Sequence, residues 1–396
     1  MDQHTRRRKD RRSQLASVAA ELFRARGYSG VGINDIAAAA GVTGPALYRH
    51  FTDKQAILAY VLLSGLDELE RRTAEAAATL DAGRLGVLLN ELAAVAVERR
   101  DVTALWRWEG RHLSPEDQRK IAKRSSGLLS TWAKMLLSLR PELRPEDAEL
   151  LCWATLSVFG SVSVHRTSVA RQRYVTLLVG LARQVLHADL PATEAVPSAT
   201  PPSPGVGTPS RREQLLSSAA ELFHQRGFHA VSMEDIGAAA GIAGPSVYKH
   251  FPSKSGLFCA IARRVAGRLA LDAERALQRS ANETEALQRL AESYVRVLTG
   301  SPELLVSLSV PGANIPEQDR ADLIRAQRDY VAQWVDLLVA ARPGLPAREA
   351  TITVHAALTI ANDLTRTRRL AARPRLAAEL VALMTAVLGE PREPRA

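Results

Sequence analysis

The chain contains the same segment twice, with the second copy 200 positions after the first. Residues 11–58 align with residues 211–258 without a gap, and roughly half of the positions are identical. The motif Tyr-Arg-His-Phe at 48–51, for example, recurs as Tyr-Lys-His-Phe at 248–251. A period this long exceeds the roughly 20–50-residue units of solenoid repeats, so each copy is expected to be a whole domain. The repeat therefore constrains the chain to two related units.

Composition and charge bound the class of protein. With 396 residues, 46% of them hydrophobic and 24% charged, the chain is typical of a globular protein of two or three domains. Its net charge of +10 permits a polyanionic partner such as nucleic acid. The charge is uneven, because residues 1–60 carry a net +5 and residues 209–260 a net +1. The basic arm at 6–9 is either a solvated tail or a contact to phosphate or the minor groove.

Cysteine usage and hydropathy exclude several classes of protein. Cys152 and Cys259, one in each half, cannot form a disulfide framework or a metal knuckle, and both are expected to pack inside helical cores. The N-terminal stretch is polar and basic, unlike a signal peptide, and no apolar run reaches membrane-spanning length. We therefore expect a cytoplasmic protein with no membrane partner, no metal site and no cofactor.

Outside the repeated segment the pattern is helical. Residues 191–209 are rich in Pro, Ser and Thr, which is typical of a linker. On either side, apolar residues recur at helical spacing without sustained period-2 alternation, so the expected fold class is all-α. A shorter match, Arg140-Pro141 with Arg342-Pro343, extends the repeat into the long helices. Helix breaks are expected at Pro115, Pro141, Pro145, Pro302, Pro311, Pro316, Pro343 and Pro346.

The repeated segment itself is a helix-turn-helix pattern. A first helix is expected to stop at Gly27, a second to end at Gly41, and a third to begin near Thr43 with Pro45 in its first turn. The stretch 52–55, Thr-Asp-Lys-Gln, predicts a capping box that opens a fourth helix. Leu47 and Phe51 are expected in the core.

Two short helices joined by a glycine turn place the second helix in the major groove of double-stranded DNA. The Gly-Pro start of that helix is slim, and the residues after it offer hydrogen-bonding groups suited to phosphate and base edges. The candidate DNA-binding residues of the first copy are Thr43, Gly44, Pro45, Ala46, Tyr48, Arg49, His50 and Lys54. Those of the second copy are Ala243, Gly244, Pro245, Ser246, Tyr248, Lys249, His250 and Lys254.

These motifs resemble the N-terminal domain of TetR-family transcriptional regulators, over about 50 residues in each half. The resemblance rests on Asp35-Ile36-Ala37, Ala40-Gly41-Val42 and Leu47–Phe51, and on their counterparts from Asp235 to Lys254. It implies two TetR-like units, each a three-helix helix-turn-helix head plus a helical ligand-binding and dimerisation body. It also implies that the last two long helices of each half, roughly 147–188 and 348–388, pack together as an intramolecular pseudo-dimer.

The resemblance divides the chain into domains and implies a function. The expected domains are a helix-turn-helix domain at 1–56, a ligand-binding and dimerisation-like domain at 57–190, the linker at 191–209, and their counterparts at 210–256 and 257–390. The implied function is a ligand-responsive, sequence-specific DNA-binding regulator, a repressor that a small-molecule effector releases from its operator. The chain is expected to be monomeric, with further association on DNA left open.

Two departures from the family refine these expectations. The chain fuses two complete units, as in the less common single-chain tandem members. Pro45 and Pro245 stand where many members carry glycine, a variant that resembles members sensing fatty acyl or steroid-derived CoA thioesters. The effector is therefore expected to be apolar or acyl-type, such as an acyl-CoA or a lipid-like molecule.

The two heads differ at positions that should face DNA. Thr43 becomes Ala243, Ala46 becomes Ser246, Arg49 becomes Lys249 and Asn34 becomes Glu234. Thr43 is able to cap its helix and Ala243 is not, a loss of about 1 kcal/mol. Because a fused chain has no need for identical heads, the operator is expected to be asymmetric.

The ligand site is the least constrained element. Trp106, Trp108 and Glu109 either form a cavity wall with an orienting polar group or are core and surface residues. No nucleophile, metal or phosphate-loop motif indicates an enzyme, and lone histidines such as His355 are expected to be core residues. The rival interpretation is a ligand-binding or scaffold protein with vestigial heads, but basic groups persist in both heads.

Overall fold

Every regular element that the structure describes is helical, which confirms the all-α prediction. The computed structural model describes residues 3–77, 82–100, 103, 105, 110–191, 210–308 and 315–390. Apart from Pro191, the predicted linker lies outside these residues. The chain divides into two units, Met1–Leu186 and His187–Ala396.

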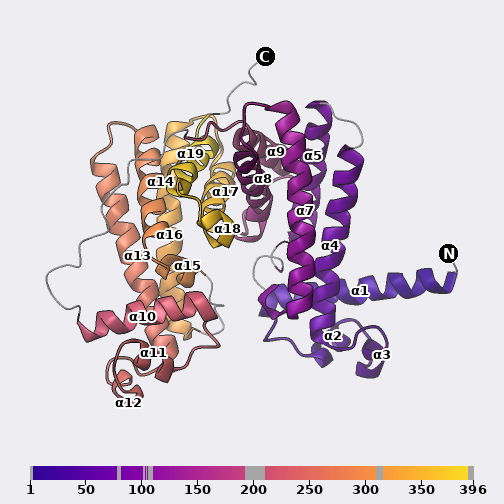
Figure 1. Cartoon of the computed structure of the whole chain (residues 1–396), viewed down its shortest axis with the longest axis horizontal. Coiled ribbons are helices and arrows are strands. Elements are labelled where there is room, and N and C mark those ends of the chain that lie inside the picture. Colours follow the sequence, from indigo (N-terminus) through magenta and orange to yellow (C-terminus); the bar gives the residue numbers. More distant parts are fainter. Residues whose placement is uncertain are drawn as a thin grey trace. The chain divides into compact units, whose positions relative to one another are not determined.

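The first unit consists of a three-helix head followed by a helical body (Figure 1). The head comprises α1 (Gln3–Arg26), α2 (Ile33–Ala39) and α3 (Gly44–Tyr48). The body comprises α4 (Lys54–Ala77), α5 (Ala82–Glu98), η1 (Gly110–His112), α7 (Pro115–Leu139), α8 (Pro145–Gly160), η2 (Ser161–Ser163) and α9 (Arg171–Leu186).

The second unit repeats this order. Its head comprises α10 (Arg211–Arg226), α11 (Met233–Ala239) and α12 (Gly244–Val247). Its body comprises α13 (Lys254–Gln278), α14 (Glu283–Gly300), α15 (Glu303–Ser307), α16 (Glu317–Ala341), α17 (Ala347–Arg366), α18 (Arg368–Ala371) and α19 (Leu376–Leu388).

Each head forms around one apolar face of its first helix. Leu15, Ala19 and Phe23 repeat at a spacing of four, share one side of α1 and are almost fully buried. They pack with Ile36 of α2 and Leu47 of α3 in one core cluster, which continues into the start of α4. The second head has the equivalent cluster around Leu215, Ala219 and Phe223. Each head therefore packs against the first helix of its body, and the two share one apolar core.

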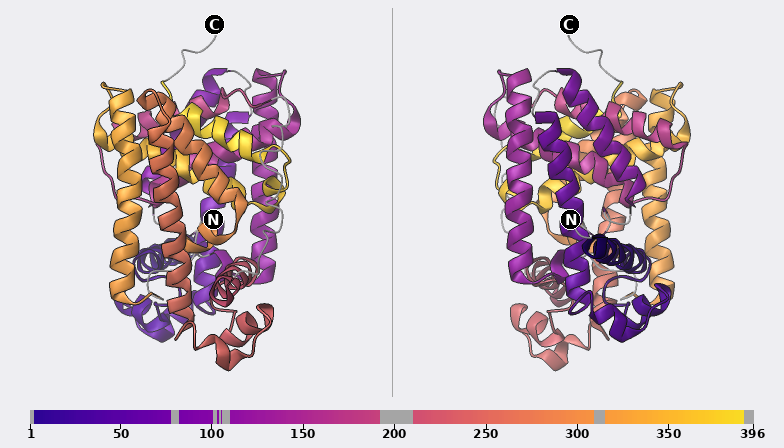
Figure 2. Two further views of the ribbon diagram at one scale, coloured as in Figure 1. Left: turned by 90° about the vertical axis from the view of Figure 1, so that its left-hand side faces the viewer. Right: turned by 90° about the vertical axis from the view of Figure 1, so that its right-hand side faces the viewer.

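That first body helix extends away from each head. In the first unit α4 packs on α5 and α7, and in the second α13 packs on α14 and α16. Figure 2 shows these long helices running from the head into the body of each unit. A shift of either helix therefore moves the head that it carries.

The repeated Arg-Pro motif closes each body. Arg140 ends α7, and its Nη1 donates a hydrogen bond of 2.8 Å to the carbonyl of Leu186, at the end of α9. Arg342 ends α16 and donates equivalently, at 3.0 Å, to the carbonyl of Gly389 after α19. Because the last carbonyls of a helix lack partners within it, the arginine satisfies one of them. This shared role explains why the motif recurs.

Several of the helix breaks predicted at prolines coincide with the starts of helices. Pro115 and Pro145 occupy the first turns of α7 and α8, where the missing N–H costs nothing. In the second unit Pro302, Pro316 and Pro346 directly precede α15, α16 and α17. Pro311 lies outside the described residues.

Candidate nucleic-acid interface

The turn of each head has the geometry that the sequence predicts. Gly41 has φ +63° and Gly241 has φ +68°, a left-handed conformation that glycine adopts without strain. The chain then reverses within three residues, and α3 and α12 begin at Gly44 and Gly244 with proline in the first turn. Gly27 also has a positive φ, +73°, directly after α1. The predicted helix-turn-helix is therefore confirmed in both copies.

The third helix of each head turns one side inward and the other outward. Leu47 and Phe51 are buried, which confirms their predicted core role, and their counterparts Val247 and Phe251 are buried as well. Tyr48 is 55% exposed and Tyr248 48% exposed, unusual values for large aromatic side chains. An aromatic residue held outward on a short helix indicates a contact surface.

The predicted DNA-binding residues divide by exposure. Those on the outer side are exposed, namely Thr43, Pro45, Tyr48, Arg49, Ala243, Pro245, Tyr248, Lys249 and His250. The others are half-buried, namely Gly44, Ala46, His50, Lys54, Gly244, Ser246 and Lys254. Within the described residues, the side chains of Tyr48, Arg49, Tyr248 and Lys249 make no hydrogen bond or ion pair. Their polar groups are therefore available to an external partner.

Lys54 and Lys254 serve the fold of the heads. Lys54 Nζ donates hydrogen bonds of 2.8 Å to the carbonyls of Tyr28 and Val31 and lies 4.2 Å from the Tyr28 ring centroid. Lys254 Nζ donates equivalently to Val231 at 2.8 Å, and burial lowers the pKa of this lysine. Each lysine ties the loop after the first helix to the first body helix. A DNA contact by either lysine stays a prediction.

Two capping predictions are wrong. Thr43 stands at the N-cap of α3 with extended backbone, but its side chain makes no capping hydrogen bond, so the expected advantage over Ala243 is absent. At the start of α4 the cap is Asp53 instead of Thr52, because Asp53 Oδ1 accepts from the N–H of Ala56 at 2.7 Å. Gln55 does not fold back, since its Nε2 donates to the carbonyl of His112 at 2.7 Å.

One arginine in each head stacks on aromatic rings, a role that the sequence analysis did not predict. The Arg12 guanidinium lies 4.8 Å from the ring centroids of both Phe51 and Tyr60. Arg212 lies 4.3 Å from the Phe251 ring and donates to the carbonyl of His250 at 3.2 Å. These contacts hold the chain directly after the third helix. The presence of this arginine in both copies is the sequence feature that could have indicated its role.

The first helices differ in length. α10 begins at Arg211, capped by Ser210, whose Oγ accepts from the N–H of Glu213 at 3.2 Å. α1 begins at Gln3, so the basic arm at 6–9 is part of a helix and not a separate tail. The side chains of the arm lie outside the described residues. α1 is therefore longer at its N-terminal end than α10.

Each head is joined to its body by different chemistry. In the first unit the rings of Tyr28 and His112 stack with centroids 4.7 Å apart, beside the Gln55 hydrogen bond. In the second unit Arg264 of α13 forms ion pairs with Glu213 of α10 and Glu303 of α15. Ser64 is the counterpart of Arg264, so the first unit has no equivalent ion pair at this position.

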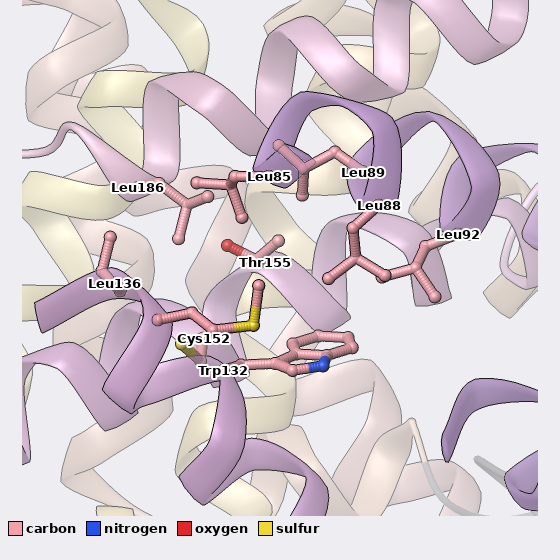
Figure 3. Close-up of a pocket in the computed structure, with 10 residues that line it drawn as sticks. Leu85, Leu88, Leu89, Leu92, Trp132, Leu136, Cys152, Thr155 and Leu186 are labelled. Carbon is pink, nitrogen blue, oxygen red and sulfur yellow. The ribbon is translucent and has the colours of Figure 1, made fainter. Parts of the chain in front are cut away.

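The body of the first unit contains a small apolar cavity of about 20 Å³. Figure 3 shows its side chains converging from α5, α7, α8 and α9. The lining residues are Leu85, Leu88, Leu89, Leu92, Trp132, Met135, Leu136, Cys152, Thr155 and Leu186. Burial raises the pKa of Cys152 to about 12, so its thiol is a neutral part of the wall.

The predicted ligand residues Trp106, Trp108 and Glu109 lie outside the described residues. In the described cavity the aromatic wall is Trp132, whose Nε1 donates to Thr73 Oγ1 at 2.8 Å. The Arg-Pro motifs align Trp132 with Trp334 of the second unit. Trp334 is fully buried and packs edge-on against Tyr294 and Tyr330, at 6.3 and 6.2 Å between ring centroids. The two bodies therefore differ in their interiors.

The described residues also bear on cysteine, metal and membrane sites. Cys152 and Cys259 are free and buried, as expected for packing cysteines. Across the described ranges no group of three or more His, Cys, Asp or Glu side chains is placed to hold a metal ion. None of the described helices combines the length and the apolar character needed to cross a membrane.

Comparison with known proteins places both heads in one family. The family described as "Bacterial regulatory proteins, tetR family" matches residues 15–61 and 215–261. The HTH-type transcriptional activator FasR of Mycolicibacterium smegmatis is 36% identical over 84 residues, 21% of this chain and 38% of FasR. The HTH-type transcriptional repressor KstR2 of Mycobacterium tuberculosis is 29% identical over 130 residues, 33% of this chain and 65% of KstR2.

These relatives and the solved structures are similar to parts of the chain. The chain spans less than two thirds of the length of FasR and of KstR2. A TetR-family transcriptional regulator from Bordetella parapertussis 12822 has 21% sequence identity and a TM-score of 0.41, and the match covers 45% of this chain and 95% of that regulator. The family match falls on both three-helix heads, so the chain carries two domains in tandem that match the tetR family of bacterial regulatory proteins.

Proposed function

We propose that the chain is a transcriptional repressor without catalytic activity, which binds an operator in cytoplasmic DNA through both heads and leaves it when a small molecule binds. One observation carries the proposal. In each head the end of the third helix and the residues directly after it present an exposed tyrosine and an exposed basic residue, which have no partner within the described residues. Such groups suit phosphates and base edges in a major groove.

The test is DNA binding by the purified full chain, with a promoter fragment selected by its own affinity. Replacing both Tyr48 and Arg49 with Ala is expected to weaken binding several-fold or more, and the binding constant should fall steeply with salt. Arg119→Ala removes the same charge from an exposed position of α7 and serves as the control. Unchanged binding after the double substitution would show that this helix does not read DNA.

The effector is proposed to be a small apolar or acyl-type molecule bound in the body of the first unit. The apolar cavity at Trp132 supports this choice, because leucines supply most of its wall and Thr155 its hydroxyl. A cavity of about 20 Å³ must widen to admit such a ligand. The ligand then favours the widened state and, through α4, an altered head position.

A pair of neighbouring substitutions tests this site. Leu88→Phe fills the cavity from α5, whereas Val87→Phe adds the same bulk on a side chain that is 57% exposed. With an acyl-CoA, fatty acid and steroid panel, we expect tryptophan fluorescence and operator release to respond in the wild type and in Val87→Phe. Leu88→Phe should respond less. No response in the wild type across the panel would remove this effector class.

We further propose that one chain supplies both halves of the family's usual dimer. The last helices of each unit, α8 with α9 and α17 with α19, are the counterparts of the family's dimerisation helices. The linker has an r.m.s. reach of about 25 Å and an extended limit of about 65 Å, which suffices to tether two such pairs. Light scattering is expected to find a 43.0 kDa particle without DNA. An obligate two-chain particle at low concentration would contradict this assembly.

A further inference from the structure

The residue second in α2 and in α11 lies directly beside the start of the third helix. A methyl group on Cα of Gly44 would be 3.4 Å from Oδ1 of Asn34. The same group on Gly244 would be 3.2 Å from Cγ of Glu234. Positions 34 and 234 are therefore in contact with the first residue of the exposed third helix in their own heads.

These two side chains have no task within the fold. The cap of each helix is made by the next residue, since Asp35 Oδ2 accepts from the N–H of Gly32 and Asp235 Oδ2 accepts from that of Ser232. Asn34 and Glu234 are exposed and make no hydrogen bond or ion pair with any described residue. Both side chains are therefore accessible to an external partner.

Their chemistry differs in kind. An Asn amide both donates and accepts, which matches the N6 and N7 edge of adenine in the major groove. A Glu carboxylate only accepts, which matches the N4 amino group of cytosine and opposes phosphate. We propose that positions 34 and 234 are a specificity-determining pair, through which the first head selects adenine and the second selects cytosine at the equivalent position of each half-site. The inference rests on the proposed DNA-binding function.

The neighbouring charges reinforce the difference. In the first head Arg49 is an exposed cation and Asn34 adds no charge. In the second head both the Lys249 cation and the Glu234 carboxylate are exposed. The next residue is aspartate in both heads, Asp35 and Asp235, so it does not distinguish them. The second head should therefore gain less from phosphate contacts and depend more on a base that donates to Glu234.

The experiment selects operators from a random double-stranded library with the full wild-type chain and with Glu234→Asn. We expect the wild type to show unequal half-sites, with cytosine at one position of the second. Glu234→Asn should replace that cytosine by adenine and change the affinity ratio of the two bases by about fivefold or more. Asn34→Glu should produce the reverse change in the other half-site, and Glu274→Gln, on exposed α13 surface, should change neither.

The outcomes separate the two proposals. If the wild type selects no sequence and binds no DNA, the proposed function fails, and this inference fails with it. Suppose that the wild type binds DNA and that the variant with Tyr48 and Arg49 replaced by Ala binds it less tightly. If Glu234→Asn then selects the same bases as the wild type, this inference alone is overturned. Circular dichroism of the variants confirms that each retains its helical fold, since both positions are exposed.

Discussion

At the scale of single residues, Gly237 in the second head leaves no room for a side chain, whereas the first head has an alanine at the same position. A Cβ on Gly237 would lie 2.9 Å from Cγ2 of Val247 and 3.0 Å from the carbonyl oxygen of Ile242. The first head has Ala37 and Leu47 at these positions, both buried. Leucine branches one carbon later than valine, so it leaves room next to the backbone for an alanine methyl group.

This contact leads to a double-mutant prediction. Gly237→Ala should lower the free energy of unfolding by about 1–3 kcal/mol through overpacking, despite the better helix propensity of alanine. Adding Val247→Leu should recover most of the loss by recreating the pair found in the first head. Thermal denaturation of the full chain followed by circular dichroism measures both. A double variant no more stable than Gly237→Ala alone would contradict the account.

His355 makes stability depend on pH. Burial in α17 lowers its pKa to about 4, from an ordinary value of 6.5, because the charged ring loses hydration. Between these values the unfolded chain binds more protons than the folded one, so stability is lost as pH falls from about 6.5 to 4, by up to about 1.4 kcal/mol per unit. His355→Gln should flatten this part of the stability profile, whereas His224→Gln, at an exposed site, should not. Denaturant unfolding at several pH values tests the difference.

At the scale of elements, Arg264 joins the second head to its body. Its guanidinium pairs with Glu213 of α10 and with Glu303 of α15, whose side chain is 15% exposed. Arg264→Met should cost about 1–3 kcal/mol, since it leaves Glu303 poorly solvated and without its cation. Adding Glu303→Gln should recover part of that loss. Arg71→Met, at an exposed arginine paired with Glu68 and Glu75, should cost little.

Hydrogen exchange locates the effect of Arg264→Met. Amides of α10 should exchange faster than in the wild type, because α10 loses its ion pair to α13. Amides of α1 should be unchanged, since the first head is joined to its body through Tyr28, His112 and Gln55. Equal exchange of α10 in both proteins would show that the ion pair does not hold the head.

The heads were predictable because local rules determine them. The turns need glycine at 41 and 241, and the helical period alone places Leu47 inward and Tyr48 outward. Capping was less predictable, since Thr43 has the right residue type but makes no capping hydrogen bond, and Asp53 instead of Thr52 caps α4. Lys54 resembled a phosphate ligand, but its carbonyl partners lie on a loop more than twenty positions earlier. Contacts between distant segments require the tertiary fold.

The bodies were less predictable for a related reason. The scarcity of tryptophan points to Trp106 and Trp108, which lie outside the described residues, and gives no reason to single out Trp132, which lines the described cavity. The Arg-Pro motifs could have identified Trp132, because counting back eight positions from Arg140 and from Arg342 aligns Trp132 with Trp334. No local pattern shows that one of these residues borders a cavity and the other packs against two tyrosines.

At the scale of the whole molecule, fusion lets the two units diverge. A homodimer must use one set of residues for both heads, so its operator tends to be palindromic. Here the units differ in the length of the first helix, in the joint between head and body, and in the interior of the body. Divergence at all three levels indicates that the halves no longer perform identical tasks.

The operator should therefore be asymmetric, with the first head contributing more of the salt-dependent affinity. Residues 1–60 carry a net charge of +5 and residues 209–260 a net +1, and Arg49 pairs two acceptors where Lys249 offers a point charge. Arg49→Ala should reduce the slope of log K against log salt by about one, and Lys249→Ala by less. Footprinting with scanning mutagenesis of the operator tests the rest. A perfect palindrome whose halves tolerate mutation equally would mean that the heads, although different in sequence, read DNA alike.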